Sequence, residues 1–396
     1  MAGFVKQIVK RMGKDSVLGK RLPAAYRRAA CAPVRAGKIL FVSATSPVPP
    51  VSFELIMPRL AARDDMEVEF VSLHKGAVPW QEYVSNCECY AENAATAQLI
   101  FLDDASDVTS CLPLRPETRA IQLWHACGAF KRWGMATVGL EHGEDAGEIR
   151  RHPGYENLSL VSVSSPEVVW AYAEAMDLKG REGIIRPLGV SRTDVFFDKT
   201  YRENARRKLA NTFPAIDGRK IVLYAPTFRG TALRAQAPGD LDIPLLQDAL
   251  GDGCTLVIKH HPFVKERPAI PADARGFAFD ASDSDLGVNE LMCAADMLVT
   301  DYSSVVFEYS LLGRPLAFFA PDIDDYGDWR GFFYPYDEMT PGPVVSTSAD
   351  LALAIARSLS AFDPAEVNAF RERFMDACDG HCTDRIIEAS LALLSS

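Results

Sequence analysis

Residues 297–319 read MLVTDYSSVVFEYSLLGRPLAFF, and this segment is the clearest guide to how the chain folds. An apolar run at 297–300 ends in a cluster of polar residues, a helical pattern occupies 304–312, and a second apolar run follows at 316–319. Short apolar runs joined by an amphipathic stretch are typical of buried parallel strands connected by a helix. The segment therefore predicts one β-α-β unit of an open parallel sheet.

The same alternation recurs on both sides of this segment and forms two series. The first series predicts strands at 38–43, 68–73, 98–102, 121–124 and 160–164, with helices at 53–62 and 166–176. The second predicts strands at 221–225, 255–258, 297–300 and 316–319, with helices at 201–209, 244–250, 288–295 and 304–312. The sequence thus predicts an α/β protein with two Rossmann-like doubly wound lobes and a ligand in the crevice at the carboxyl ends of their strands.

Length and composition also favour two lobes. The 396 residues, 48% of them hydrophobic and 24% charged, exceed what one core comfortably organises. We expect a basic N-terminal segment at 1–37, a first lobe at 38–190 and a second lobe at 191–396. The second lobe is expected to include two C-terminal helices, at 364–378 and 384–394, that can pack back across the first lobe.

The charge is distributed unevenly along the chain. The net charge is −11, but residues 1–38 carry ten basic residues against the single acid Asp15. Apolar residues recur there at helical spacing, at Phe4, Val5, Ile8, Val9 and Met12. An amphipathic basic helix of this kind can lie on an anionic membrane surface, and the alternative is a helix packed on its own protein. Nucleic acid is not expected as a partner, because the acidic remainder would repel phosphates.

The location of the protein is predicted from what the sequence lacks. No apolar run approaches the roughly 20 residues that span a bilayer, and no apolar block with a cleavage site opens the chain. Nine cysteines, an odd number, suit free thiols in a reducing compartment. We therefore expect a cytoplasmic protein that is peripheral on the inner face of the cell membrane.

One candidate residue follows a strand of the first lobe. His125 comes directly after the predicted strand that ends at Trp124, and Ala126, Cys127 and Gly128 are small enough to let a ligand approach the backbone. An imidazole at a strand end can act as a general base. The alternative is a structural histidine.

Two loops of the second lobe contain basic residues. After the strand at 221–225 come Pro226, Thr227 and Arg229, and the arginine can clamp a phosphate or be an ordinary loop residue. After the strand at 255–258 come basic side chains that suit an anion better than a metal, because no Cys or carboxylate nearby completes a ligand set. They are Lys259, His260 and His261.

The loop after residues 297–300 has the richest polar content. Ser303 and Ser304 lie just before a helix, where hydroxyls and free N–H groups bind phosphate oxygens. Glu308 falls one turn later on the face of Ser304 and can accept hydroxyl groups. The alternative is a helix cap without a ligand.

Several function classes are disfavoured because their motifs are missing. The sequence has no P-loop, no convincing GxGxxG turn after the first strand and no GxSxG elbow. Two cysteine groups lack metal-finger spacing and are interpreted as incidental thiols: Cys87 with Cys89, and Cys378 and Cys382 with His381. We expect neither a cofactor nor a strict metal requirement.

Together these segments resemble the CDP-glycerol glycerophosphotransferase family, the teichoic acid primases and polymerases of the bacterial wall. The matching stretches are QLWHACGAFKRWG (122–134), RPLGVSRTDVFF (186–197), IVLYAPTFRG (221–230), LVIKHHPFV (256–264), MLVTDYSSVVFEYSLLGRPLAFFAPD (297–322) and WRGFFYPYDEMTPGPVV (329–345). The resemblance implies a glycosyltransferase-B-like fold in which the first lobe receives the acceptor and the second lobe holds the donor.

The resemblance also implies an activity and roles for individual residues. The implied reaction moves glycerol phosphate from CDP-glycerol to a polyprenyl-linked glycan or polymer and releases CMP. His125 matches the base, His261 a histidine on the donor phosphates, and Arg192 a donor-binding arginine. Further donor-contacting positions are matched by Pro226, Thr227, Lys259, His260, Ser303 and Ser304.

Two departures from the family pattern leave alternatives open. Many members read Gly-Thr-Pro where this chain has Ala126, Cys127 and Gly128. Glu308 stands where Asp is usual, and the longer side chain can alter the preference among glycerol, ribitol and other alditols. The competing interpretations are a CDP-ribitol transferase, a nucleotide-sugar glycosyltransferase or epimerase of the same fold, and a non-catalytic envelope-assembly protein.

Overall fold

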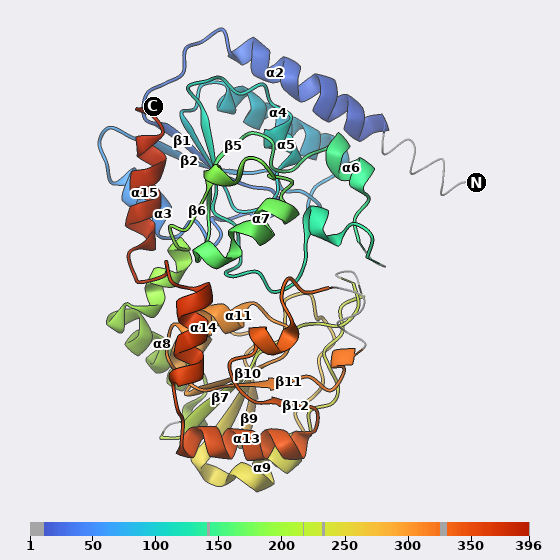
Figure 1. Ribbon diagram of the computed structural model, residues 1–396, viewed down its shortest axis with the longest axis vertical. Helices are drawn as coiled ribbons and strands as arrows, with labels where there is room; N and C mark the ends of the chain where they lie inside the picture. The colour runs from blue at the N-terminus through green and yellow to red at the C-terminus, as the bar shows by residue number, and fades with distance from the viewer. Residues whose placement is uncertain (1–11, 141–142, 217, 232–233, 325–330, 396) are drawn as a thin grey trace, which may run out of the picture. The chain divides into compact units, whose positions relative to one another are not determined.

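The computed structural model describes residues 12–140, 143–216, 218–231, 234–324 and 331–395, which form two compact units (Figure 1). Unit 1 comprises the described residues up to Ala126, together with Trp133–Arg192 and the described residues from Ala377. Unit 2 comprises Cys127–Arg132 and Thr193–Asp376. Each unit is built around its own parallel sheet.

The sheet of unit 1 has six strands in the order β2-β1-β3-β4-β5-β6, all parallel. The strands are β1 (Lys38–Ser43), β2 (Glu67–Ser72), β3 (Leu99–Leu102), β4 (Arg119–Gln122), β5 (Leu158–Ser162) and β6 (Ile185–Arg186). The helices are α2 (Leu22–Ala29), α3 (Ile56–Ala61), α4 (Trp80–Ala94), α5 (Asp107–Ser110), α6 (Ala146–Arg151), α7 (Val169–Ala175) and α15 (Cys382–Ala392). The strand order reverses between β1 and β3, so this is a doubly wound sheet.

The sheet of unit 2 also has six parallel strands, in the order β12-β11-β10-β7-β8-β9. The strands are β7 (Lys220–Tyr224), β8 (Cys254–Ile258), β9 (Ala278–Asp280), β10 (Met297–Thr300), β11 (Leu316–Phe319) and β12 (Val344–Val345). The helices are α8 (Lys199–Thr212), α9 (Ile243–Leu250), α10 (Val288–Ala294), α11 (Val305–Ser310), α13 (Ser348–Ser360) and α14 (Ala365–Phe374). Its order reverses between β10 and β7, next to the loops that follow those strands.

Burial explains why these segments form strands. All six residues of β1 are buried, as expected for a strand covered on both faces, and Phe41 stacks on Phe101 of β3 at 4.6 Å between ring centroids. In unit 2, Leu246 of α9 and Ile355 of α13 are fully buried against the sheet. Both units therefore carry a core of their own.

The predicted α/β fold with two doubly wound sheets is confirmed. All nine predicted strands are present, within two residues of their predicted ends. The short strands β6, β9 and β12 and the helices α4 and α13 were not predicted. Strands of two or three residues carry no usable periodicity, and α4 contains polar residues that weaken its apolar stripe.

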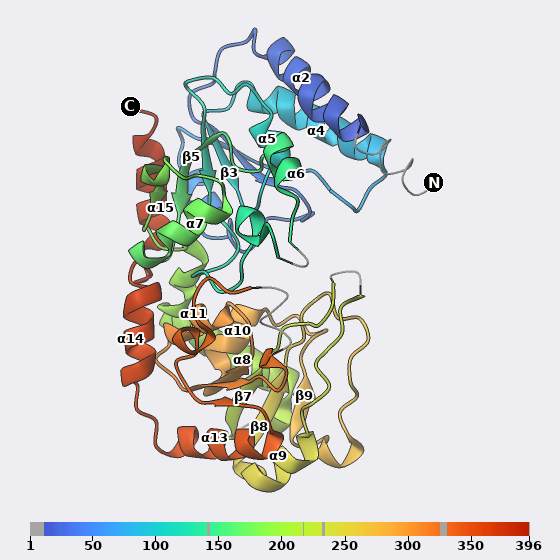
Figure 2. The same ribbon diagram turned by 45° about the vertical axis from the view of Figure 1, so that its right-hand side comes forward.

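The end of the chain departs from the predicted division into lobes. Helix α14 packs on α11 in unit 2, where Phe370 stacks on Phe307 at 5.4 Å. Helix α15, red in Figure 2, instead packs on α3 in unit 1. In the same unit, the hydroxyls of Ser191 and Thr383 lie 2.9 Å apart. Residues 377–396 had been assigned to the second lobe, and their contacts place the described part of them in unit 1.

The basic N-terminal segment is partly described. Phe4, Val5, Ile8 and Val9 lie outside the described residues. Residues 12–29 of the segment are helical, and α2 packs along α4. Its cations contact acids of the same unit: Arg21 forks onto Glu88 at 2.8 and 3.0 Å, Arg28 donates to Glu92 at 3.1 Å, and Lys14 lies 2.7 Å from Asp107.

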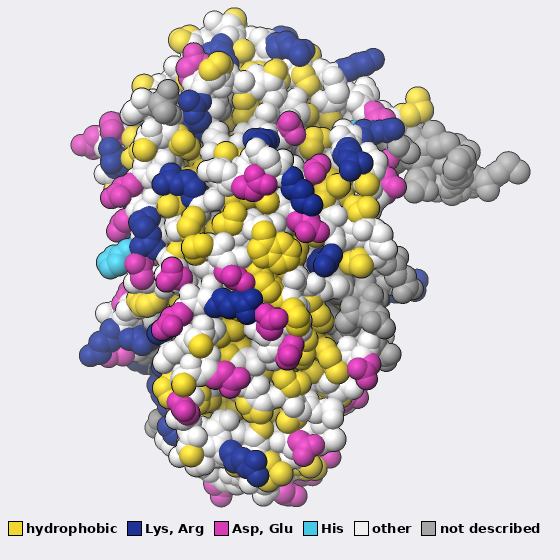
Figure 3. Space-filling view, viewed as in Figure 1, with side chains coloured by type: hydrophobic (Ala, Val, Ile, Leu, Met, Phe, Trp, Pro, Cys, Tyr) yellow, Lys and Arg dark blue, Asp and Glu magenta, His cyan; other side chains and the backbone are white. Residues whose placement is uncertain are grey.

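These ion pairs support the alternative of a helix packed on its own protein for the described part of the segment. Exposed pairs of this kind contribute little free energy each, about 0–1 kcal/mol, but they neutralise charge that a membrane would otherwise attract. Basic and acidic side chains are interspersed on the face shown in Figure 3. Among the described residues, no helix has the length and apolar character needed to cross a bilayer.

Candidate functional site

A strained turn follows β4 and presents His125. Trp124 has a φ of +59°, a left-handed conformation that bulky residues rarely adopt. The turn is held from both sides, because Oε1 of Gln122 accepts the Trp124 N–H at 3.0 Å and the Ser52 hydroxyl donates to the Trp124 carbonyl at 2.9 Å. Gln122 is fully buried, and its Nε2 donates to the Asp104 carbonyl at 3.0 Å. Buried partners thus fix the backbone next to the exposed imidazole.

The imidazole of His125 is oriented by its own hydrogen bond. Its Nδ1 lies 3.2 Å from the backbone carbonyl oxygen of Asp103. A carbonyl can only accept, so Nδ1 carries the proton and Nε2 of the neutral ring keeps its lone pair. The Asp104 carboxylate lies 3.9 Å from the same Nδ1, where it would stabilise the ring after Nε2 takes up a proton. This arrangement suits a general base.

Asp103 has an unusual carboxyl group. Burial raises its pKa to about 6, and the nearby Asp104 adds to the rise, although the Ser43 hydroxyl donates to the carboxylate at 3.1 Å and opposes it. A raised carboxyl pKa beside an exposed histidine is typical of functional sites. Asp103 and Asp104 were not predicted as site residues, although two adjacent aspartates directly after an apolar run are a usable signal.

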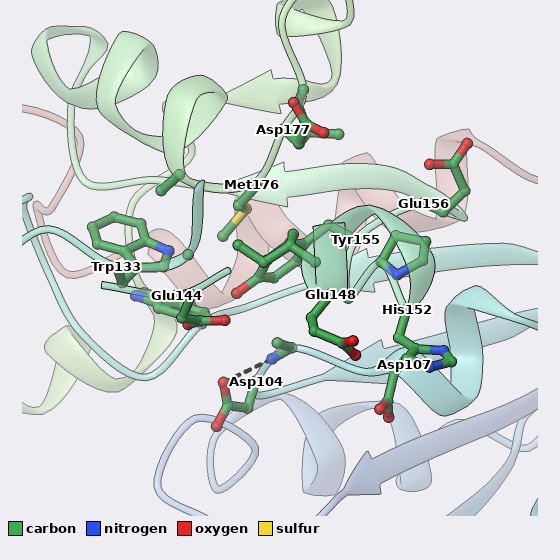
Figure 4. Close-up of a pocket in the computed structure, with 18 of the residues that line it drawn as sticks. Asp104, Asp107, Trp133, Glu144, Glu148, His152, Tyr155, Glu156, Met176 and Asp177 are labelled. Atoms are coloured by element: carbon green, nitrogen blue, oxygen red, sulfur yellow. Dashed lines mark hydrogen bonds between the residues drawn. The ribbon is translucent and has the colours of Figure 1, made fainter. Parts of the chain in front are cut away.

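A pocket of about 480 Å³ opens beside His125 (Figure 4). Trp124, Trp133 and Tyr155 supply its aromatic surface, and the two indoles stack with centroids 5.3 Å apart. Carboxylates dominate its charged lining, and they are Asp104, Asp107, Glu144, Glu148, Glu156 and Asp177. All lining residues belong to unit 1.

The small residues after His125 have a packing role. Gly128 has a φ of +61°, and a Cβ placed there would overlap the ring of Phe307. Cys127 is buried, and the Ala126 carbonyl accepts the Tyr172 hydroxyl at 3.4 Å. Gly128 was expected to let a ligand approach the backbone, but in the structure an aromatic side chain of the protein occupies that space.

In unit 2, Arg229 lies in a dense polar network. Its Nε and Nη2 fork onto Asp322 at 2.6 and 3.0 Å, and Nη1 donates to Asp301 at 2.9 Å. Burial opposes the charged form, but the two carboxylates outweigh it and raise the pKa of Arg229 above its ordinary value. Thr227 also donates its N–H and hydroxyl to Asp301, at 2.8 and 3.0 Å.

This network differs from the phosphate clamp that was predicted. A guanidinium held by two carboxylates is already neutralised, so Arg229 stabilises the loop after β7 in this structure. Thr227 lies in the same network, with Pro226 buried before it. No local pattern indicates that Asp301 and Asp322 meet this arginine from two other strand ends.

The three basic residues in the loop after β8 lie in different environments. Lys259 donates to the carbonyls of Ala281 and Leu286, both at 2.9 Å, and burial lowers its pKa. His260 is 7% exposed, and burial lowers its pKa as well, which favours the neutral ring. The ammonium of Lys259 thus holds a neighbouring loop, which differs from the predicted donor contact.

His261 is held differently from its neighbours. Its Nδ1 accepts the N–H of Phe263 at 3.2 Å, so Nε2 carries the hydrogen in the neutral ring. The ring lies between Phe228 and Phe263, at 4.9 and 4.6 Å between centroids, and Phe263 is 48% exposed. His261 therefore offers an N–H donor.

The remaining predicted residues lie just before or within α11 and in a turn before α8. Ser303 and Ser304 are half-buried between β10 and α11, and Ser304 is the N-cap residue of α11. Glu308 is only 1% exposed, so its carboxylate is withdrawn from solvent. Arg192 is half-buried in the 3₁₀ turn Ser191–Phe196. Among the described residues, no three His, Cys, Asp or Glu side chains are placed to hold a metal ion together.

Comparisons with known proteins agree on one family. A family model described as CDP-Glycerol:Poly(glycerophosphate) glycerophosphotransferase matches residues 24–391. The teichoic acid ribitol-phosphate primase of Bacillus spizizenii is 34% identical over 329 residues, which cover 83% of each protein. The teichoic acid poly(ribitol-phosphate) polymerase of the same organism is 34% identical over 358 residues, which cover 90% of this chain but only 56% of that enzyme.

Solved structures show a similar fold. A structure of the wall teichoic acid polymerase TagF matches with a TM-score of 0.74 at 21% identity, over 99% of this chain and 98% of that one. This likeness supports the predicted glycosyltransferase-B-like fold. The family match covers most of the sequence, and the chain therefore belongs to the CDP-glycerol:poly(glycerophosphate) glycerophosphotransferase family, whose members are phosphotransferase enzymes.

Proposed function

We propose that this chain transfers an alditol phosphate from a CDP-alditol to a hydroxyl group of a lipid-linked envelope glycan or polymer and releases CMP. The observation that carries the proposal is the hydrogen bond from Nδ1 of His125 to the Asp103 carbonyl, which leaves Nε2 free to accept a proton. The acceptor oxygen attacks the alditol-bearing phosphorus, its proton moves to Nε2, and the bond from that phosphorus to the CMP oxygen breaks.

The donor phosphates need hydrogen-bond donors and positive charge. We propose that His261 donates its Nε2–H to a phosphate oxygen, since its Nδ1 is occupied by the Phe263 N–H. The hydroxyls of Ser303 and Ser304 and the guanidinium of Arg192 are the other proposed donor contacts. We propose further contacts from Pro226, Thr227 and His260 through the backbone or side chains of the loops that hold them.

The identity of the alditol on the donor is a separate part of the proposal. CDP-glycerol is the donor named by the family description, and it is the first candidate. CDP-ribitol is the second, because both relatives compared above act on ribitol phosphate and are 34% identical to this chain. Glu308, which stands where the family usually has Asp, is the residue expected to influence this choice.

We also propose that the protein works at the inner face of the cell membrane, where a polyprenyl-linked acceptor would lie. The described basic side chains are largely paired within unit 1, so the membrane contact would depend on charge not used in those pairs. Flotation with vesicles containing anionic lipid tests this, and binding that is absent at low salt would contradict it.

One assay tests the reaction and the donor together. The purified protein is incubated with a lipid-linked disaccharide and either CDP-glycerol, CDP-ribitol or a UDP-sugar, and the released nucleotide and product mass are measured. The expected result is CMP with alditol phosphate added to the acceptor, unchanged by EDTA. Release of UDP with glycosyl transfer would overturn the proposal.

His125→Ala tests the proposed base in the same assay. Turnover should fall at least about 10²-fold while CDP-alditol affinity stays nearly unchanged, because the lost group acts on the acceptor proton. A comparable loss of donor affinity would mean that His125 is a binding residue instead.

A further inference from the structure

The pocket beside His125 has the dimensions of a ligand site. Its volume of about 480 Å³ falls within the roughly 300–1,000 Å³ typical of small-molecule pockets. Its walls come from separate segments of unit 1: the loop after β3, the turn after β4, α6 with the residues that follow it, and the end of α7. His125, the candidate base, lines the pocket, so a hydroxyl-bearing ligand bound here would lie next to its imidazole.

The charge of the pocket is strongly negative. Six carboxylates line it, against the ammonium groups of Lys14 and Lys75, which gives −4 when His125 and His152 are neutral. Lys14 lies 2.7 Å from Asp107, so that pair contributes little net charge. In Figure 4 the carboxylates are distributed along the pocket from Asp177 to Asp104. A chain of phosphodiesters entering this space would meet charge of its own sign along its whole length.

The uncharged part of the lining is aromatic and apolar, and it favours contact with the carbon skeleton of a ligand. The stacked indoles of Trp124 and Trp133, with Tyr155 and Met176 nearby, present apolar surface to the carbon skeleton of a ligand. Ionised carboxylates only accept hydrogen bonds, so they pair well with hydroxyl groups. Aromatic faces together with acceptor oxygens fit a sugar or polyol that carries many hydroxyls and no charge.

We propose that this pocket receives the reacting end of the acceptor and selects an uncharged, hydroxyl-rich terminus over a polyanionic alditol-phosphate chain. The inference rests on the proposed function and adds the chemical class of acceptor. It assigns the enzyme to the addition of a first unit to a neutral glycan, with chain extension as the disfavoured reaction. The selectivity comes from the carboxylates, and the aromatic surface binds the skeleton of either acceptor.

The test compares acceptors that carry different numbers of alditol-phosphate units and therefore different negative charge. The same lipid-linked disaccharide is prepared with no, one or three alditol-phosphate units, and kcat/KM is measured from CMP release in buffer with EDTA. The neutral acceptor should be preferred at least about 10-fold over the acceptor with three units, and the preference should shrink as salt screens the pocket. Equal or better use of the charged acceptors would overturn the proposal.

Paired variants show whether the pocket causes the preference. The double variant Glu144→Gln with Glu148→Gln should reduce the ratio of neutral to charged kcat/KM at least about threefold. The double variant Asp64→Asn with Glu82→Gln removes two exposed charges of unit 1 outside the pocket and should leave that ratio unchanged. If both double variants shift the ratio equally, the selectivity belongs to the overall charge and the pocket proposal is wrong.

Acceptor binding without donor separates this proposal from the proposed function. Titration of each acceptor into the protein should show tighter binding of the neutral one, and His125→Ala should retain this order. Selective binding without CMP release would contradict the proposed reaction alone. CMP release without selective binding would contradict the pocket proposal alone.

Discussion

Oε1 of Gln122 accepts the backbone N–H of Trp124 at 3.0 Å and so supports a left-handed turn directly before the candidate base. The Ser52 hydroxyl holds the carbonyl on the other side of the same residue. A conformation of this kind costs roughly 1–3 kcal/mol and persists only where its surroundings enforce it. Two buried side chains outside the pocket lining therefore determine where the imidazole of His125 lies.

Removing these supports should reduce turnover without weakening donor binding. Gln122→Met and Ser52→Ala are expected to lower kcat roughly 10-fold each, because a small displacement of a catalytic group is costly, while KM for the CDP-alditol stays within about twofold. Thr118→Val is the matched control, since it removes another buried hydrogen bond of unit 1, just before β4 and at the opposite end of that strand from the turn. A similar loss of kcat in the control would show that the effect is only general destabilisation.

Gly128→Ala should destabilise the protein through two separate effects. The positive φ adds backbone strain, and the new Cβ overlaps the Phe307 ring, for a total loss of roughly 2–5 kcal/mol in the free energy of unfolding. Gly180→Ala has a similar φ of +85° but open space around it, so it should show the strain alone. Urea unfolding measures both variants. Equal losses of unfolding free energy in the two variants would mean that the Phe307 ring moves aside with no energetic penalty.

Arg229→Met should be strongly destabilising. It leaves Asp301, which is 1% exposed, and Asp322 without their cation, and breaking a buried ion pair from one side costs about 3–5 kcal/mol. Arg267→Met is the control, because its closer partner Asp283 is 84% exposed and its second partner Asp280 lies 3.6 Å away and is 30% exposed, so the loss should stay within about 1 kcal/mol. Chemical denaturation compares the two. A loss below about 1 kcal/mol for Arg229→Met would show that the network does not depend on the arginine.

Asp103 should make stability depend on pH. Its folded-state pKa of about 6 lies above the ordinary value near 3.9, so the native state binds more protons between these values and stability falls as pH rises through this window. The total change is roughly 2–3 kcal/mol. Asp103→Asn should abolish this fall, which unfolding at pH 4.5 to 7.5 measures. Parallel pH profiles for the two proteins would contradict the assignment.

The sequence predicted the strands whose residues are all buried. It did not predict the side-chain contacts between residues that lie far apart in the chain. The runs at 297–300 and 316–319 are fully buried, and both strands begin and end where predicted. Arg229 and Lys259 were expected to contact a ligand because each follows a strand. Their actual partners, Asp322 and the carbonyl of Leu286, are brought near only by the strand order of the sheet. Local pattern cannot show such long-range pairing.

The same limit explains Gly128, where a small residue next to a candidate base indicated room for a ligand. Phe307, which fills that room, comes from a helix about 180 residues later in the chain. A function predicted from a family resemblance depends less on local pattern, because the resemblance rests on several segments that lie far apart in the chain. The candidate residues themselves remain predictions for the experiments above.

The described residues from Ala377 onward, including α15, complete unit 1, although unit 2 lies between them and the rest of that unit in the sequence. During synthesis, therefore, unit 2 can emerge from the ribosome whole while unit 1 still lacks its final helix. Premature termination between Asp376 and Cys382 would leave unit 2 complete and expose the surface of α3 that α15 covers, which makes such fragments natural targets for chaperones and proteases.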